Sequence, residues 1–258
     1  MALVIPFYMI FNRKGYQAIY GFFRKRMGYS PLKAFGNVYL NHFRFGQVIL
    51  DRFGAFAGKK YQFECEGLEL MEHLESLPKG FLMLSSHVGC YEMVGYSLKP
   101  KTKKMNALVY AGETATVMEN RQRVLGHNNI QMVPVKEDLS HLFALNAAID
   151  NGDIVSMPAD RIFGSQKSVE CQFFGAKANF PLGGFAMAVQ KEVPVLAVFV
   201  MKIGMKKYRV FLKSVECDSQ AKKRDQMTQL AQGFATQLED IVRRYPTQWF
   251  NYFDFWQQ

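Results

Sequence analysis

Short runs of consecutive apolar residues alternate with longer stretches of helical spacing over most of this chain. The clearest apolar runs are Phe81–Leu84, Ala107–Tyr110, Met132–Val135, Ile154–Met157 and Val195–Val200. A strand that is apolar on both faces must be covered on both faces, as in the parallel sheets of α/β proteins. The sequence therefore predicts an α/β fold with a mixed, largely parallel sheet that is flanked by helices on both faces.

Turn residues divide the remaining strand patterns. Gly175 separates Ser168–Phe174 from Ala178–Phe180, which predicts a hairpin, and Gly204 separates a second strand pair, Val195–Lys202 and Tyr208–Val215. Tyr61, Phe63 and Cys65 alternate with polar residues as in a strand. Helical spacing is found over Leu68–Leu77 and from Lys222 to Arg244.

In the N-terminal part the residue pattern is that of helices, without the alternation of strands and helices seen later. Ser30 followed by Pro31 is typical of a helix start, and helical spacing continues into the forties. We therefore divide the chain into an N-terminal helical, membrane-associating portion (1–58) and an α/β domain (59–258). Met1–Asn12 is apolar, but it lacks a basic leader and is shorter than the roughly 20 residues that span a bilayer. We expect neither a signal peptide nor a complete transmembrane helix.

The net charge of the chain narrows the classes of molecule that it could bind. The chain carries 32 Lys and Arg against 22 Asp and Glu, a net charge of +10, which attracts anionic groups. No nucleic-acid-binding signature accompanies this charge, so an anionic lipid or an acidic carrier fits better than nucleic acid.

The four cysteines are widely spaced, which argues against a metal site or a disulfide framework. Basic residues interleaved with Tyr16, Tyr20, Phe22 and Phe23 suit a membrane interface, although the same aromatic residues could pack on the domain.

His87 is the leading candidate for chemistry. It follows the apolar run that ends near Ser85, at the carboxyl edge of the predicted sheet, where α/β proteins bind ligands. If His87 lies in the turn and Glu92 in the first turn of a following helix, the carboxylate can reach the imidazole. Such a pair removes a proton from a hydroxyl. A surface histidine and an ordinary first-turn glutamate are the alternative.

Two rival nucleophiles lie nearby. Cys90 could attack a carbonyl, and Ser85 or Ser86 could serve in a serine hydrolase. The chain has no G-x-S-x-G elbow, and a cysteine among apolar residues is more often a buried hydrophobe. We rank both rivals below the His87 and Glu92 pair.

The segment from Ser86 to Glu92, Ser-His-Val-Gly-Cys-Tyr-Glu, resembles the His-x4-Asp/Glu motif of the lysophospholipid-acyltransferase-like superfamily, nearest its lipid A late acyltransferase branch. Segments 152–161 and 173–175 and the closing Tyr-Pro-Thr-Gln-Trp-Phe at 245–250 are similar to that branch, so the resemblance runs over residues 36–256. Relatives generally begin with a fuller hydrophobic anchor, whereas here only Leu3–Phe11 remains.

This resemblance implies transfer of a fatty acyl group from acyl carrier protein or coenzyme A to a hydroxyl of a lipid A precursor or related glycolipid. His87 would be the general base and Glu92 its orienting partner, with no metal or other cofactor. Backbone N–H groups near Val88 and Gly89 could stabilise the oxyanion. The implied location is the cytoplasmic face of the inner membrane, with peripheral or weak anchoring.

Other polar residues are candidates for substrate binding. Asp160 and Arg161 should lie at a second strand end, where Arg161, with Lys167, could hold a phosphate or carboxylate, although a structural ion pair is an equal alternative. The family tends to place polar residues near the acceptor groove, here Asn120, Arg121 and Arg123, although a helix there could simply expose these residues to solvent, and we rank them below the other candidates. Two other functions stay open, a non-catalytic lipid-binding protein and a thioesterase that uses the same dyad.

Overall fold

The computed structural model describes residues 4–109, 128–162 and 167–257, and a seven-stranded sheet forms its centre. In spatial order the strands are β1 (Gln62–Glu66), β9 (Lys207–Val215), β8 (Val195–Lys202), β2 (Phe81–Ser85), β5 (Ile154–Pro158), β3 (Met105–Val109) and β4 (Ile130–Pro134). Neighbours run parallel except for β8 and β9, which pair antiparallel. The predicted mixed, largely parallel sheet is confirmed.

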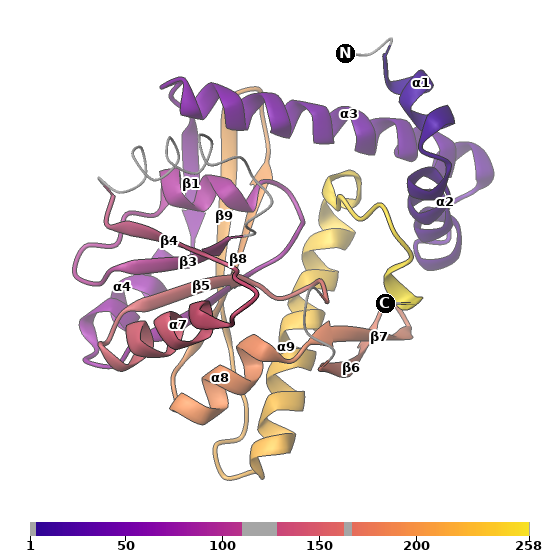
Figure 1. The fold of residues 1–258 in the computed structure, drawn as a ribbon. Helices are drawn as coiled ribbons and strands as arrows, with labels where there is room; N and C mark the ends of the chain where they lie inside the picture. Colours follow the sequence, from indigo (N-terminus) through magenta and orange to yellow (C-terminus); the bar gives the residue numbers. More distant parts are fainter. Residues whose placement is uncertain (1–3, 110–127, 163–166, 258) are drawn as a thin grey trace.

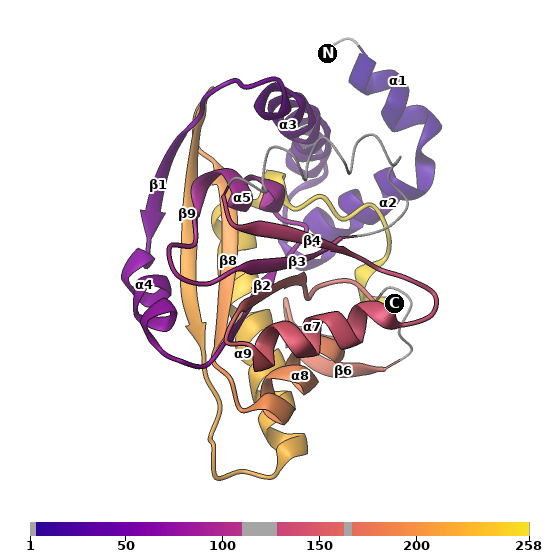
Figure 2. The ribbon, with the colours of Figure 1, turned by 60° about the vertical axis from the view of Figure 1, so that its left-hand side comes forward.

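Helices cover both faces of this sheet. Figure 2 shows α7 (Ser140–Asp150) and α8 (Gly183–Lys191) on the opposite side of strands β2–β4 from α5 (Val94–Ser97). Side chains of β8 alternate between two buried clusters, with Ala197 and Phe199 in one and Val198 and Val200 in the other. The first cluster includes α9 (Lys223–Arg244), and the second includes α4 (Leu68–Ser76). Burial on both faces explains why these strands are continuous apolar runs.

The N-terminal part is helical, as predicted. It consists of α1 (Val4–Phe11), α2 (Arg13–Gly21), a π-helical turn η1 (Phe22–Arg26) and α3 (Pro31–Phe56). The Ser30 hydroxyl accepts a hydrogen bond from the Lys33 N–H, which confirms the predicted helix start. Figure 1 shows α3 crossing above the sheet and α9. Among the described residues, no helix combines the length and the apolar character that crossing a bilayer requires.

A hairpin outside the main sheet confirms another prediction. β6 (Ser168–Phe173) and β7 (Ala176–Pro181) pair antiparallel through a two-residue turn. Both turn residues, Phe174 and Gly175, have positive φ, the conformation that the twist of a tight hairpin requires. Phe173 packs against Trp249 and Phe255 from the C-terminal segment, so the hairpin joins that segment to the core.

A buried polar cluster fixes α3 to the sheet. Asp51 on α3 forms an ion pair with Lys202 at the end of β8, and both side chains are almost inaccessible to solvent. The Tyr208 hydroxyl donates a hydrogen bond of 2.7 Å to the same carboxylate oxygen, and the Tyr61 hydroxyl donates one of 3.2 Å to the other. Burial and the Asp51 charge raise the pKa of Tyr61 to about 12, so its hydroxyl stays protonated and able to donate.

Removal of the Asp51 carboxylate should destabilise the fold strongly. The change Asp51→Ala leaves the Lys202 ammonium buried without its partner, and breaking such a pair from one side costs about 3–5 kcal/mol. Glu72→Ala is the control, because the Glu72–Lys101 pair is exposed and solvent screening leaves it little effect on stability. Urea unfolding measures both free energies. Equal losses in the two variants would show that the buried pair does not anchor α3.

Candidate functional site

The register of two neighbouring strands brings His87 and Asp160 together. Ser85 at the end of β2 is paired with Pro158 at the end of β5, and the strands are parallel. His87 lies two positions after Ser85, and Asp160 lies two positions after Pro158, so both are at the carboxyl edge of the sheet. The Ala159 N–H donates to the Ser85 carbonyl at 2.9 Å and continues the ladder into this turn. His87 thus lies where its strand pattern places it.

Both carboxylate oxygens of Asp160 are bound to His87. Oδ1 lies 2.8 Å from the ring Nδ1, and Oδ2 accepts a 2.8 Å hydrogen bond from the His87 backbone N–H. Burial of Asp160 would raise its pKa, but the two hydrogen bonds from His87, the charge of His87 when it is protonated and the Arg161 charge outweigh burial, so the pKa is lowered. The carboxylate is therefore ionised and can only accept, which puts the imidazole proton on Nδ1 and leaves Nε2 basic.

Glu92 has a different partner from the one expected. Its Oε1 accepts a 2.9 Å hydrogen bond from Nη1 of Arg52 on α3, in an ion pair whose side chains are mostly buried. The expectation that Glu92 orients the ring is thus corrected in one respect: the carboxylate on Nδ1 belongs to Asp160. Asp160 follows the neighbouring strand, which presents it directly to the histidine. Arg52 was not singled out in the sequence, because nothing local links it to Glu92.

The segment after His87 is less helical than predicted. Only a 3-10 turn, η2 (Tyr91–Met93), and the single turn of α5 follow it. The Gly89 N–H donates to the Gln248 carbonyl at 2.8 Å, and the Cys90 N–H donates to the Val200 carbonyl at 2.8 Å. The prediction of oxyanion donors near Val88 and Gly89 is therefore wrong for the Gly89 amide, which is already used.

The rival nucleophiles fit poorly. Cys90 is 2% exposed, and burial raises the pKa of its thiol far above neutrality, so no thiolate is available. Ser85 and Ser86 are also buried. The Ser86 hydroxyl has no hydrogen-bond partner among the described residues, so no base activates it there.

Arg161 follows Asp160 and is mostly enclosed. Its Nη2 donates a 2.7 Å hydrogen bond to the Phe250 carbonyl, and its guanidinium lies 5.4 Å from the centre of the Phe253 ring. Burial lowers the pKa of Arg161, while the charges of Asp160, Tyr91 and Tyr252 oppose this shift. Arg161 therefore links the site to the C-terminal segment, and anion binding stays a prediction.

The remaining candidates for substrate binding are Lys167 and a group of polar residues outside the described part of the chain. Lys167 is exposed just before β6, and its carbonyl accepts from the Leu182 N–H at 3.1 Å. Asn120, Arg121 and Arg123 fall within residues 110–127, which the structure does not describe. The aromatic residues expected at a membrane interface are partly core residues, since Phe22 and Phe23 are 3% and 0% exposed. Phe22 packs against Trp249 with ring centres 4.8 Å apart.

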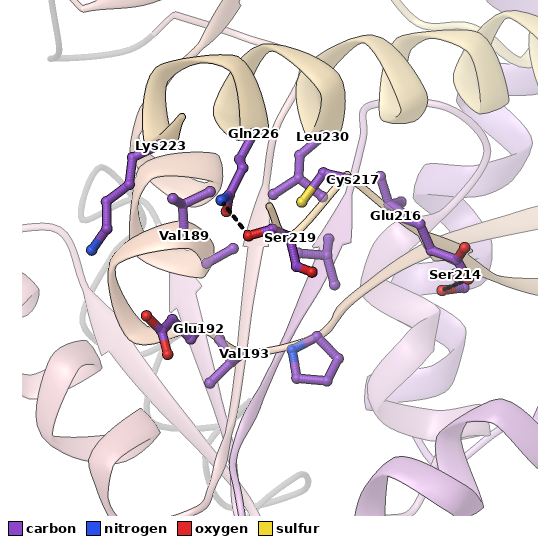
Figure 3. Close-up of a pocket in the computed structure, with 14 residues that line it drawn as sticks. Val189, Glu192, Val193, Ser214, Glu216, Cys217, Ser219, Lys223, Gln226 and Leu230 are labelled. Carbon is purple, nitrogen blue, oxygen red and sulfur yellow. Dashed lines mark hydrogen bonds between the residues drawn. The ribbon is translucent and has the colours of Figure 1, made fainter. Parts of the chain in front are cut away.

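A cleft of about 580 Å³ lies at the other end of the sheet (Figure 3). It is lined by Val195 at the start of β8, by Val215 at the end of β9 and by Leu230 on α9. Leu82 on β2 is paired with Val195, whereas His87 lies beyond the far end of β2. The cleft is thus separated from His87 by the length of the strand and does not belong to the catalytic candidate.

One family of known proteins matches most of the chain. The family model described as bacterial lipid A biosynthesis acyltransferase matches residues 56–257. No curated protein matches the chain. Among solved structures, the 1-acyl-sn-glycerophosphate (LPA) acyltransferase PlsC from Thermotoga maritima is similar, with 14% identity and a TM-score of 0.44, over 96% of this chain and 97% of that chain.

Gly89 should tolerate no side chain. Its φ of +61° disfavours other residues, and a Cβ would lie 2.0 Å from the Val200 carbonyl oxygen. Gly175 is the matched control, because its φ is +70° but a Cβ there would have nothing within 4 Å. We expect Gly89→Ala to lose at least about 2 kcal/mol more unfolding free energy than Gly175→Ala, which carries the conformational penalty of about 1–2 kcal/mol alone. Similar losses in chemical denaturation would contradict the close approach.

Proposed function

Because the chain belongs to the bacterial lipid A biosynthesis acyltransferase family, we propose that it esterifies a hydroxyl of a lipid A precursor or related glycolipid. The acyl donor is a thioester of acyl carrier protein or coenzyme A. The observation that carries the proposal is the double hydrogen bond between Asp160 and His87, at the carboxyl edge of the sheet. Family membership implies an acyl donor and a lipid acceptor, and the site supplies a base for the acceptor.

His87 acts as the general base in this proposal. With its proton on Nδ1, the ring takes the acceptor hydroxyl proton on Nε2 as the oxygen attacks the thioester carbonyl carbon. The tetrahedral intermediate collapses with cleavage of the carbon–sulfur bond. The imidazolium then returns its proton to the departing thiolate, so that an ester and a thiol are formed and the enzyme is restored. The ionised Asp160 stabilises the imidazolium between these two steps.

The remaining residues have supporting roles in the proposal. Glu92 is the second carboxylate of the His-x4-Glu motif, and its ion pair with Arg52 fixes the turn that follows His87. Arg161 and Lys167 would bind an anionic group of the donor or acceptor, such as a phosphate. Arg161 is the better supported of the two, because it adjoins Asp160 and its guanidinium is held by the Phe250 carbonyl.

An apolar and basic surface supports contact with the membrane. Residues 1–60 contain ten basic residues and one acidic residue, Asp51, a net +9 of the total +10. On α3, Leu32 and Phe35 are 86% and 54% exposed, and Leu50 and Phe53, five turns later on the same side, are 60% and 53% exposed. Apolar side chains among cations suit an anionic bilayer surface. We infer peripheral binding of the N-terminal portion at the cytoplasmic face of the inner membrane.

Loss of the base or of its partner should abolish most of the turnover. We expect His87→Ala and Asp160→Asn each to lower kcat by about a hundredfold to ten-thousandfold, since an asparagine in place of the aspartate would present an N–H to Nδ1 and favour the other tautomer. Asp240→Asn is the control, because Asp240 pairs with Lys213 and Arg244 on the surface. The assay follows thiol release from dodecanoyl thioesters of acyl carrier protein and of coenzyme A, and the acylated lipid by mass spectrometry.

Each outcome of that assay separates the candidate functions. Undiminished turnover in His87→Ala would refute the role of His87. Release of free fatty acid without an acylated lipid would identify a thioesterase instead. Binding to lipid without thioester cleavage on any acceptor would identify a non-catalytic lipid-binding protein.

Membrane binding should depend on the exposed apolar face of α3. We expect Leu32→Gln/Phe35→Gln to weaken binding to phosphatidylethanolamine–phosphatidylglycerol vesicles by at least about tenfold, because burying each side chain contributes about 1.5–3 kcal/mol. Leu142→Gln/Phe143→Gln on α7 is the matched control, since these side chains are 41% and 78% exposed. Vesicle co-sedimentation measures both. Equal weakening by the two double variants would argue against a specific membrane face.

A further inference from the structure

The C-terminal segment contacts the main chain of the candidate base directly. The Phe250 N–H donates to the His87 carbonyl at 3.2 Å, and the Gln248 carbonyl accepts from the Gly89 N–H at 2.8 Å. These bonds flank an antiparallel bridge between Val88 and Trp249. Residues 246–251, named here the C-terminal strap, consist of a 3-10 turn, η3 (Pro246–Gln248), and an extended part that pairs with the turn carrying His87 through the Trp249 bridge.

The turn needs this support because it is buried but irregular. Beyond Ser85 the ladder of β2 ends, yet Val88 is 0% exposed and Cys90 is 2% exposed. Buried backbone groups without partners cost about 1–3 kcal/mol each. On one side β8 supplies partners through Val200, which accepts from the Cys90 N–H. On the other side the C-terminal strap supplies the hydrogen-bond partners, so the position of the His87 main chain depends on the strap.

Gln248 fixes the strap to the sheet. Its Oε1 accepts a 2.9 Å hydrogen bond from the Lys202 N–H, and its Nε2 donates a 2.9 Å bond to the Lys202 carbonyl. The side chain is 4% exposed, so both bonds are protected from water. The side-chain amide of Gln248 thus adds one more pair of hydrogen bonds at the end of β8. The backbone carbonyl of Gln248 then lies at the Gly89 N–H.

Contacts of three further residues, Asn41, Arg161 and Trp249, hold the strap in register. Asn41 on α3, 0% exposed, donates to the Trp249 carbonyl at 2.8 Å and to the Thr247 carbonyl at 3.3 Å. Arg161, the neighbour of Asp160, donates to the Phe250 carbonyl. Trp249 packs against Phe22, Phe173 and Phe255, with ring centres 4.8, 5.7 and 5.2 Å apart.

We propose that Gln248 is a positioning residue for acyl transfer, which holds the C-terminal strap against the His87 turn and so sets the main chain from which the base projects. The inference rests on the proposed function, because it assigns His87 the role of base. Asp160 holds the ring and the His87 N–H, and the strap holds the His87 carbonyl on the other side of the same residue. A displacement of about 1 Å in such a group can lower turnover by about a hundredfold.

Gln248→Leu tests the proposal, because leucine is close in size but cannot bond to Lys202. Gln232→Leu is the matched control, since Gln232 makes the same pair of bonds with the backbone of Gln172 on β6, and its other side-chain hydrogen bond among the described residues is to Thr236. We expect Gln248→Leu to lower kcat at least about tenfold while the KM for dodecanoyl-coenzyme A stays within about twofold. Gln232→Leu should leave kcat unchanged, even if it lowers the melting temperature as much as Gln248→Leu does.

Hydrogen–deuterium exchange gives a second measurement that needs no turnover. In Gln248→Leu, the peptide spanning residues 81–93 should exchange at least about tenfold faster, and in Gln232→Leu it should not. Unchanged exchange, or faster exchange with unchanged kcat, would overturn the proposal. If the wild-type protein itself shows no turnover, the proposed function fails, and the exchange result alone decides whether the strap holds the His87 turn.

A second variant covers loss of folding. If Gln248→Leu does not fold, Asn41→Ala replaces it, because the Asn41 side chain holds the strap through the Thr247 and Trp249 carbonyls and makes no bond to Lys202. The same faster exchange and lower kcat are expected. Wild-type values for both quantities in Asn41→Ala would overturn the proposal.

Discussion

The buried Asp160 carboxylate determines the geometry of the site through its two hydrogen bonds to His87. One buried carboxylate binds both the ring and the backbone of the same residue, so the imidazole cannot turn without loss of a bond to an ionised group. This geometry exists because β2 and β5 are neighbours in register, with Ser85 opposite Pro158. A shift of either strand by one residue would send one of the two side chains to the other face.

Both ends of the chain contribute to this site. From the N-terminal part, Arg52 on α3 pairs with Glu92, and Asn41 holds the C-terminal strap. From the C-terminal part, the strap pairs with His87 and Gly89. Asp51, one residue before Arg52, anchors α3 to Lys202, whose backbone binds Gln248. The N-terminal helices are therefore joined to the carboxyl edge of the sheet by buried polar contacts, and the exposed apolar side of α3 faces away from them.

The sequence predicted the fold well because its strands are buried on both faces, which leaves a strong local pattern. The hairpin at Gly175, the last helix and the position of His87 at a strand end were also local signals. The partner of His87 could not be found from a local signal, because Asp160 lies 73 positions further along the chain and only the strand order brings it near. Local spacing favoured Glu92 instead. Gln248 and Arg52 were missed for the same reason, since their contacts are 46 and 40 positions away.

The position of the proton on the His87 ring decides whether Asp160 holds the imidazole as proposed. A long-range proton–nitrogen correlation spectrum of the wild-type protein, with the His87 signals assigned by their absence in His87→Ala, reports which ring nitrogen is protonated at a pH where the ring is neutral. We predict a proton on Nδ1 and an unprotonated Nε2. A proton fixed on Nε2 would contradict it, because the ring could then neither donate to Asp160 nor accept the proton of a lipid hydroxyl.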